Sequence, residues 1–373
     1  MNIDSQLRRI IGQFAFPGTL IDCEAIKAGH INQTYRLRFA LDSGAARDYV
    51  LQRINTFAFK KPVEVMSNVR LVTEHLRQAM VRQGVDPFNR VLTLVPLKDG
   101  GTLWQDESGS WRAYDYIVNA RTVDRVDSPD QFREIGRAFG RFQSMLADFP
   151  IDRLFDTIPY FHDTVRRMEN FERSVGADVK GRAAGVGPEI AAIRERMSGM
   201  GRIVAMIADG TLPLRVTHND TKINNVMLDA DTGEALCVID LDTVMAGSSL
   251  YDFGDAIRYG ASTAAEDERD LSKVHIDMAL FTAYADGFIS ETAGGLTRAE
   301  LNNLPLGALV MTYENAMRFL TDYLDGDIYF HIENPDDNLA RSRCQLALLK
   351  DMEDHVDEMN SVVAGLIEKY CRA

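Results

Sequence analysis

One polar stretch, followed at once by an apolar run, restricts what this chain can fold into more than any other feature. It reads THNDTKINNVMLD and occupies residues 217–229. The apolar residues at its end, the turn signal ADTGE and the run ALCVID together predict a β-hairpin within residues 215–245. Helical hydrophobic patterns lie on both sides of this hairpin. We therefore expect a polar site built on a hairpin that is set among helices.

The spacing of the polar residues in the hairpin is typical of phosphoryl transfer. His218-x-Asp220 is followed by Asn225, and Asp240 ends the paired strand. A carboxylate such as Asp220 can orient an acceptor hydroxyl and take its proton. Carboxylate and amide oxygens are hard ligands that suit the Mg²⁺ accompanying ATP. We predict Asp220 as the catalytic base and Asn225 and Asp240 as metal ligands, with ATP and Mg²⁺ as cofactors.

Other polar residues near this site have less specific roles. His218 is expected to be a buried histidine that holds the loop together. Asp242 shares a strand face with Asp240 and is either a second carboxylate of the metal site or a polar anchor. The chain has neither GxxxxGK[ST] nor GxGxxG, so the segment that binds the phosphates is not a P-loop. The turn KAGHINQTY instead offers Asn32 and Thr34 as hydrogen-bond donors to phosphate.

Hydrophobic patterning divides the chain into a β-rich first part and a helical second part. Residues 1–118 alternate strand-like runs with one long amphipathic helix, and residues 119–373 are mainly helical around the hairpin. The fold class is therefore α+β, with a small antiparallel N-terminal lobe and a larger helical C-terminal lobe. We expect the last helix to pack on that lobe. The long helix of the first part carries one apolar stripe, made of Val65, Val69, Val72 and Leu76.

Composition excludes several classes of protein. The 373 residues carry a formal net charge of −14, which offers nucleic acid or an anionic membrane no basic surface. The four cysteines form no CxxC, so a disulfide framework or a zinc site is not expected. No apolar run approaches the roughly 18 residues of a membrane span, and the first residues lack a signal-peptide core. We expect a soluble cytoplasmic protein with small-molecule partners only. The sequence leaves the oligomeric state open, and a monomer is favoured over an assembly in which the last helix packs on a second subunit.

The motifs resemble the aminoglycoside and choline phosphotransferase superfamily of protein-kinase-like enzymes. Within that superfamily, the chain resembles the kinases that phosphorylate the anomeric hydroxyl of N-acetylhexosamines. This resemblance is carried by GHINQTY, LRVTHNDTKINNVMLDADTG, VIDLDTVMAGS, DFGDAIRYGASTAAEDERDLSKVH and MRFLTDYLDGDIYF. It implies a bilobal kinase-like fold with ATP in the cleft and GlcNAc or GalNAc as acceptor. It also implies that His30, Arg318 and Tyr329 hold the sugar, and that Lys222 contacts the transferred phosphate.

Two further expectations concern the nucleotide. Gln52 occupies the strand position where kinases usually carry the lysine that grips the α- and β-phosphates, and Asn68 lies near the usual glutamate. We expect these two amides to pair in place of that ion pair, with Arg53 as the alternative phosphate ligand. The backbone of the connector YDYIVN, at Tyr116 and Val118, is expected to bind adenine.

Three other functions compete with the sugar kinase. The first is a kinase of the same superfamily that acts on another sugar, an amino alcohol or an aminoglycoside. The second is a metal-dependent hydrolase with His218, Asp220, Asp240 and Asp242 as ligands, although the single histidine and the loop lysine argue against it. The third is an inactive nucleotide-binding protein, which the intact catalytic motif argues against.

Overall fold

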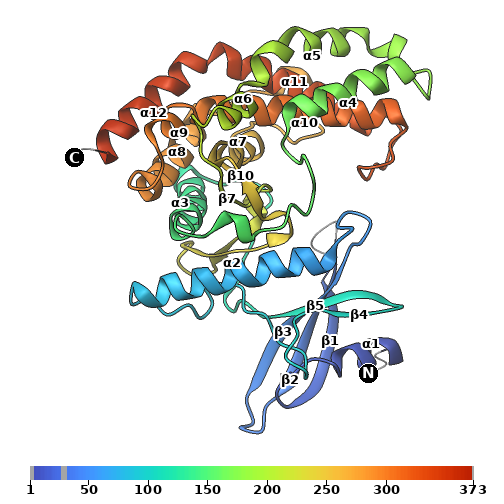
Figure 1. Ribbon diagram of the computed structural model, residues 1–373, viewed down its shortest axis with the longest axis vertical. Helices are drawn as coiled ribbons and strands as arrows, with labels where there is room; N and C mark the ends of the chain where they lie inside the picture. The colour runs from blue at the N-terminus through green and yellow to red at the C-terminus, as the bar shows by residue number, and fades with distance from the viewer. Residues whose placement is uncertain (1–3, 27–31, 372–373) are drawn as a thin grey trace.

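The chain forms two lobes, seen in Figure 1 as a β-sheet at one end and a group of helices at the other. The computed structural model describes residues 4–26 and 32–371. The first lobe, called the N-lobe below, contains α1 (Ser5–Ile11), β1 (Thr19–Ile26), β2 (Gln33–Ala40), β3 (Ala46–Ile54), α2 (Pro62–Arg82), β4 (Trp104–Asp106) and β5 (Gly109–Asp115).

The N-lobe sheet is antiparallel, with the strand order β1-β2-β3-β5-β4. Leu37 and Phe39 of β2 are buried on one face of the sheet, as the alternation of apolar residues predicts. On the other face, the strand register sets Thr34 opposite Gln52 and Gln52 opposite Arg112. These three polar side chains therefore lie in a row across β2, β3 and β5.

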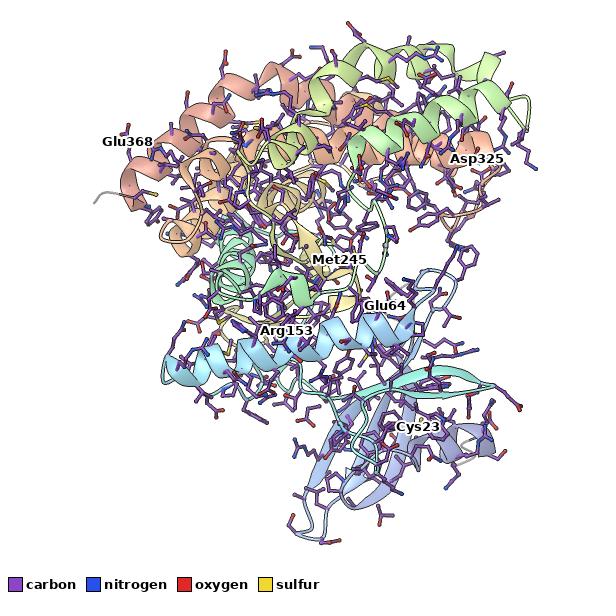
Figure 2. All side chains as sticks on the ribbon, in the orientation of Figure 1. Cys23, Glu64, Arg153, Met245, Asp325 and Glu368 are labelled. Atoms are coloured by element: carbon purple, nitrogen blue, oxygen red, sulfur yellow. The ribbon has the colours of Figure 1, made fainter. Side chains whose placement is uncertain are left out.

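The long helix α2 packs between the sheet and the second lobe. Pro62 stands in its first turn, where a missing backbone N–H costs no helical hydrogen bond. The predicted apolar stripe is confirmed, because its members are buried in one cluster with Phe142 and Leu241 of the second lobe. Figure 2 shows the side chains that fill the region between Glu64 of α2 and Met245 of the second lobe.

The second lobe, or C-lobe, is mainly helical. Its helices are α3 (Pro129–Met145), α4 (Thr164–Ala177), α5 (Gly187–Met200), α6 (Arg202–Ala208), α7 (Ser249–Gly260), α8 (Met278–Thr292), α9 (Arg298–Asn302), α10 (Leu304–Asp325), α11 (Asp337–Asp354) and α12 (Val356–Tyr370). Its strands are β6 (Ala120–Arg121), β7 (Arg215–Thr217), β8 (Val226–Asp229), β9 (Ala235–Val238) and β10 (Met245–Gly247). Its 3-10 turns are η1 (Ile151–Arg153), η2 (Ala183–Val186), η3 (Ile223–Asn225), η4 (Leu241–Thr243) and η5 (Leu271–Lys273).

Close packing holds the predicted hairpin, which is confirmed as the antiparallel pair β8–β9, within the C-lobe. Strand β6 extends this pair to three strands, and β7 pairs separately with β10. Helices α7 and α10 cross where two glycines meet, since a Cβ on Gly254 would lie 2.2 Å from the carbonyl oxygen of Gly307. Helix α7 is therefore pressed against α10 while it supports the loop that follows β7.

Two stretches whose hydrophobic patterns predict single helices, residues 268–291 and 338–370, are interrupted in the structure. The pattern over residues 268–291 becomes a helix only at Met278, after a loop that forms an isolated bridge between Ser262 and Ile276. The C-terminal pattern over residues 338–370 is two helices that meet at His355. Helix α12 packs against α8 and α9, as expected for a last helix that docks on its own lobe.

The α+β fold class, with a small antiparallel β-rich lobe and a larger helical lobe, is confirmed. The division of the chain at residue 118 stays a prediction, and it falls between β5, which ends at Asp115, and β6, which begins at Ala120. Within residues 4–26 and 32–371, no helix combines the length and the apolar character that crossing a bilayer requires.

Candidate active site

The loop that follows β7 is held in place by a buried carboxylate of α7. The two oxygens of Asp252 accept the backbone N–H groups of His218 at 2.9 Å and Asn219 at 2.8 Å. The Thr221 hydroxyl donates to the Asp252 carbonyl oxygen at 2.5 Å. These bonds fix Asn219 in a left-handed conformation, with φ of 64°. The backbone immediately before Asp220 is therefore rigidly placed.

His218 is a buried histidine whose ring serves the loop. Its Nε2 lies 2.9 Å from the carbonyl oxygen of Ile239, which can only accept, so this nitrogen carries the proton. Its Nδ1 accepts the backbone N–H of Asp220 at 3.3 Å. The ring edges pack on Phe139 and Phe142. With both nitrogens engaged, His218 connects the loop to the strand that ends at Asp240.

The structure brings Asp220, Lys222 and Asn225 together. The Lys222 ammonium lies 3.1 Å from Asp220 Oδ1, and Asn225 Nδ2 donates to the Asp220 carbonyl oxygen at 2.8 Å and to its Oδ2 at 3.3 Å. Burial alone would raise the pKa of Asp220, but the charge and the hydrogen bond of Lys222 hold it below its usual value. Asp220 is therefore ionised at neutral pH, as a proton acceptor must be.

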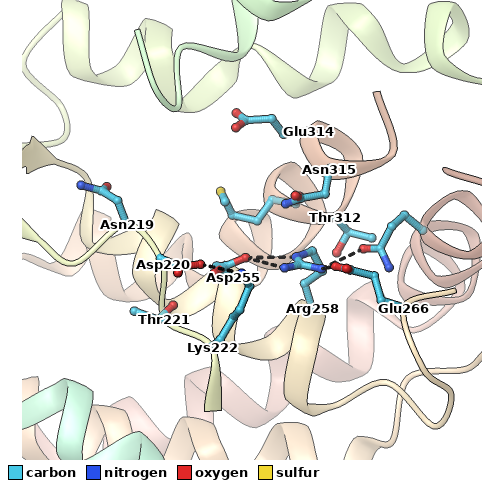
Figure 3. A network of polar contacts seen from close by, with 12 residues as sticks. Asn219, Asp220, Thr221, Lys222, Asp255, Arg258, Glu266, Thr312, Glu314 and Asn315 are labelled. Atoms are coloured by element: carbon cyan, nitrogen blue, oxygen red, sulfur yellow. Dashed lines mark hydrogen bonds and ion pairs between the residues drawn. The ribbon is translucent and has the colours of Figure 1, made fainter. Parts of the chain in front are cut away.

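A second group of charges, made of Asp255, Arg258 and Glu266, lies beside Asp220 and Lys222, as Figure 3 shows. Arg258 of α7 donates to Asp255 at 2.9 and 3.0 Å and to Glu266 at 2.5 Å. The negative charge of Asp220, followed by those of Asp255 and Glu266, raises the pKa of Lys222 despite its burial. The lysine is thus held as a cation beside Asp220.

Asp240 ends the hairpin in a left-handed conformation, with φ of 59° and ψ of 58°. Burial and the charges of Asp242 and Asp220 raise the pKa of Asp240 to about 6. Asn225 turns its Nδ2 toward Asp220, so its Oδ1 faces away from that carboxylate. Carboxylates that repel one another, beside an amide oxygen, form a donor set suited to a hard divalent cation. Asp240 and Asn225 are the residues that would hold one.

The N-lobe residues predicted to bind nucleotide meet the C-lobe through Asp242. Gln52 donates to the Thr34 hydroxyl at 3.1 Å and accepts from Arg112 Nε at 3.0 Å. Arg112 in turn makes a two-pronged ion pair with Asp242, and Asn32 Nδ2 donates to the same carboxylate at 2.8 Å. Asp242 is therefore a buried anchor between the lobes, the second of its two predicted alternatives.

The predicted amide pair between Gln52 and Asn68 is wrong. Asn68 instead tethers α2 to the C-lobe, because its amide bonds the backbone of Phe155 at 2.8 and 2.9 Å and the carbonyl oxygen of Val244 at 2.9 Å. Arg53 lies on the opposite face of β3 and reaches Gln33 at 3.4 Å. Sequence reasoning missed Arg112, although a charged residue in the apolar strand run of β5 was a visible signal.

In the connector between the lobes, the backbone N–H and carbonyl groups of Val118 already have hydrogen-bond partners. The Asn89 side chain accepts the Val118 N–H at 2.7 Å and donates to the Val118 carbonyl oxygen at 2.9 Å. The Tyr116 N–H donates to Asp48 at 3.4 Å. In the described part of the chain, the backbone of Ile117 makes no hydrogen bond. Ile117 is thus better placed than Val118 to pair with a base.

Arg318 and Tyr329, predicted to bind the acceptor, lie together at the end of α10. The Arg318 guanidinium lies 6.0 Å from the ring centre of Tyr329, 5.5 Å from that of Phe161 and 5.4 Å from that of Phe330. Among the described residues, no carboxylate lies within ion-pair distance of Arg318. A second arginine, Arg167, lies nearby. Its burial and, next, the positive charge of Arg318 lower the pKa of Arg167 to about 10. His30 lies outside the described residues.

A buried pair connects this aromatic group to the catalytic loop. His162 faces Glu314 of α10 at 2.9 Å through Nδ1 and the Asn219 carbonyl oxygen at 3.2 Å through Nε2. Burial would raise the pKa of Glu314, but His162 and Arg167 lower it to about 2. In Figure 3, Glu314 and the neighbouring Asn315 face the same region as Asn219 and Asp220. Nothing in the sequence around His162 or Glu314 indicated this connection.

Comparison with known proteins agrees with this architecture. The family model described as "Phosphotransferase enzyme family" matches residues 22–283, well over half of the chain. An amicoumacin kinase, solved with AMP-PNP and Ca²⁺, has a TM-score of 0.60 at 14% identity over 94% of each chain. A microcompartment-associated aminopropanol kinase has a TM-score of 0.59 at 15% identity, over 96% of this chain and 99% of that one. A choline kinase from Cryptosporidium parvum has a TM-score of 0.58 at 13% identity, over 98% of this chain and all of that one.

At such identities the solved structures show the fold, and the match of the family model shows the membership. The chain therefore belongs to the phosphotransferase enzyme family and has the two-lobed fold of the solved kinases that it resembles.

Proposed function

We propose that the protein transfers the γ-phosphate of ATP to the anomeric hydroxyl of an N-acetylhexosamine, GlcNAc or GalNAc. Family membership supports the transfer of phosphate to an alcohol group. The choice of sugar rests on the motif resemblance of the sequence and on the charge of the acceptor region. The function has the following chemistry.

Asp220 orients the acceptor hydroxyl and accepts its proton while the oxygen attacks the γ-phosphorus in line. The bond from that phosphorus to the β-phosphate oxygen breaks, and ADP leaves. Lys222, beside Asp220 at 3.1 Å, offsets negative charge on the transferred group. Mg²⁺ held by Asn225 and Asp240 would supply neutralisation of the phosphate charges. Most of the rate then comes from positioning, which the bonds from Asp252 to the loop support.

The nucleotide lies between the lobes in this proposal. Adenine pairs with the connector backbone near Tyr116 and Ile117, since Asn89 occupies the groups of Val118. The phosphates extend toward the polar row of β2 and β3, where Thr34 and Gln52 already bond each other at 3.1 Å. Asn32, at the start of β2, is positioned by the Asn55 N–H at 2.9 Å.

The observation that carries the choice of acceptor is the guanidinium of Arg318, which has no carboxylate partner among the described residues. Arg318 stands among three aromatic rings, whereas the neighbouring Arg167 is paired with the Glu314 carboxylate at 3.1 Å. A cationic acceptor would be repelled there. A neutral sugar has hydroxyl and amide oxygens that accept guanidinium hydrogen bonds, and Tyr329 offers a flat face to its ring.

The alternative is a kinase for another alcohol of the same superfamily. It is favoured by the solved neighbours, whose names point to aminopropanol and choline as acceptors. Each of those acceptors carries a positive charge, so the two functions differ in which charge the acceptor region must tolerate.

An acceptor screen separates these functions. Purified protein with ATP and Mg²⁺ is offered GlcNAc, GalNAc, glucose, choline, aminopropanol and spectinomycin, and ADP release is followed. Phosphorus NMR of the product then shows whether the phosphate couples to the anomeric proton. Turnover of the N-acetylated sugars with that coupling is the expected result, whereas turnover of the cationic acceptors alone would refute the sugar assignment.

Two variants test the residue roles with whichever acceptor is turned over. Asp220→Asn should lower kcat by about 10²- to 10⁴-fold, because the proton acceptor is lost, and leave ADP affinity nearly unchanged. Arg318→Gln should raise KM for a neutral sugar with a smaller effect on kcat. An Asp220→Asn enzyme that keeps most of its turnover would overturn the mechanism, and an unchanged KM in Arg318→Gln would remove the arginine from the acceptor site.

A further inference from the structure

The nucleotide phosphates need a cation from the N-lobe, and neither predicted residue supplies one. Gln52 is neutral, and Arg53 points to the far face of the sheet. Arg36 lies farther along the correct face, but it pairs with Asp48 and covers the Tyr116 ring at 4.9 Å, beside the connector. Among residues 4–26 and 32–371, the cation that lies beside Gln52 on this face of the sheet is Arg112.

Arg112 sits in the polar row that faces the C-lobe. The strand register sets it directly opposite Gln52, and its Nε donates to Gln52 Oε1 at 3.0 Å. Both terminal nitrogens bond Asp242, with Nη2 at 2.9 Å from Oδ2. The guanidinium carbon lies 5.2 Å from the ring centre of Tyr114. The group is thus fixed in orientation by three different side chains.

The same guanidinium lies next to the residues assigned to metal and phosphate. Asp242 belongs to the turn that begins directly after Asp240. Asn32, which precedes β2, donates to the Asp242 oxygen that Arg112 also bonds. The cation therefore lies where the start of β2, the polar row on β3 and the end of the hairpin meet, which is the place the proposed function gives to the phosphates.

Burying an ion pair between the two lobes costs free energy, because both charges must be desolvated. The Arg112 and Asp242 side chains are 1% and 2% exposed, so both charges lose nearly all of their hydration. Such pairs are often no more stabilising than apolar residues of similar volume. A guanidinium has five N–H donors in a fixed fork that matches phosphate oxygens, and the bonds to Gln52 and Asp242 use three of them. Nη1 also contacts the Met66 sulfur at 3.8 Å, so the arrangement holds an oriented cation with one N–H of Nη2 left over.

We propose that Arg112 is the N-lobe residue that binds the nucleotide phosphates, and that Asp242 holds its guanidinium in the binding orientation. Arg112 and Asp242 thus take the place of the lysine and glutamate expected from kinases, with the cation on β5 and the anion in the C-lobe. The inference rests on the proposed use of ATP, but it is independent of the acceptor.

The test compares ligands that share a base but differ in phosphates. Binding of ADP and of adenosine is measured by calorimetry, without acceptor, for the wild type and for the double variant Arg112→Met, Asp242→Asn, in which neither charge is left unpaired. The double variant should bind adenosine within about twofold of the wild type and ADP about 10- to 100-fold more weakly, as expected when charge-assisted hydrogen bonds are lost. Arg53→Met is the matched control on the opposite face of the sheet and should change neither affinity.

Two single variants keep the inference testable if the double variant does not fold. Asp242→Asn retains the guanidinium and should retain ADP binding better than Arg112→Lys, which keeps the charge but loses the fork. Equal ADP affinity in the wild type and the double variant, or parallel loss of ADP and adenosine, would overturn the inference, as would full ADP affinity in Arg112→Lys. A wild-type protein that binds neither ligand would instead count against the proposed use of ATP.

Discussion

Asp252→Asn should disturb the catalytic loop more than any other isosteric change in the chain. The Asp252 carboxylate is 1% exposed and accepts three N–H groups. One oxygen takes the His218 backbone at 2.9 Å and Gln143 Nε2 at 2.7 Å, and the other takes the Asn219 backbone at 2.8 Å. An asparagine has a single oxygen, so it can keep at most the first two of these bonds.

The cost follows from the bond that must be lost. When the oxygen of the new amide faces His218 and Gln143, its NH₂ faces the backbone N–H of Asn219. The buried Asn219 N–H then has no acceptor, which costs about 1–3 kcal/mol. The two surviving bonds also lose their charge assistance, whereas removing a buried charge returns part of the free energy. We expect a net loss of about 2–4 kcal/mol in the free energy of unfolding. For a lobe of this size, that corresponds to a fall in Tm of about 5–15 °C.

Thermal unfolding and kinetics together check this reasoning. Because Asn219 directly precedes Asp220, its relaxation should displace the base and lower kcat by about 10²-fold, with ADP affinity nearly unchanged. The exposed Asp42→Asn is the control for the chemical change itself, and it should leave Tm and kcat as they are. A Tm within 2 °C of the wild type, roughly the effect of a typical surface substitution, would refute the argument that Asp252 fixes the loop.

Two further substitutions test the packing and the surface electrostatics. Gly254→Ala places a Cβ 2.2 Å from a backbone oxygen of α10, so it should destabilise the C-lobe by about 1–3 kcal/mol or more. The control is Gly199→Ala, whose Cβ would meet nothing within 4 Å, and this variant should be neutral or stabilising in the same thermal unfolding experiment. The hydrogen bond with Asp351 raises the pKa of His275, so its stabilisation is fully present below the ordinary value of about 6.5 and is lost as the pH rises through the folded value. The Tm difference between wild type and His275→Gln should therefore be larger at pH 5.5 than at pH 8.5, and a difference that grows with pH would contradict this pairing.

Local pattern was sufficient to predict the elements and the catalytic hairpin. The stripe on α2 and the alternation in β2 depend only on residues within one element, and both are found as expected. The break between α11 and α12 could not be predicted in this way. The apolar period continues across His355, whereas α12 turns to pack on α8 and α9, contacts that are distant in the sequence.

The partners of the polar residues depend on contacts far apart in the chain. Arg112 and Asp242 are 130 positions apart, and His162 and Glu314 are 152 apart. Helical and strand periods carry no information at such separations. The kinase analogy assigned a partner to Gln52 from the neighbouring helix, yet Asn68 is used to hold that helix to the C-lobe. The analogy predicted the type of site, and the register of β3 against β5 decided which side chain supplies the cation.

Backbone strain gives a further reason why the polar hairpin works as one unit. Asn219 and Asp240 both adopt left-handed conformations, with φ of 64° and 59°, which cost non-glycine residues about 1–2 kcal/mol each. Asparagine and aspartate tolerate the left-handed region better than most residues, so the residue types alone do not reveal the backbone strain. The two residues are joined through His218, which accepts from the loop and donates to Ile239 just before Asp240. A change that relaxes either residue should therefore shift the other, and with it the separation between the proposed base and the proposed metal ligand.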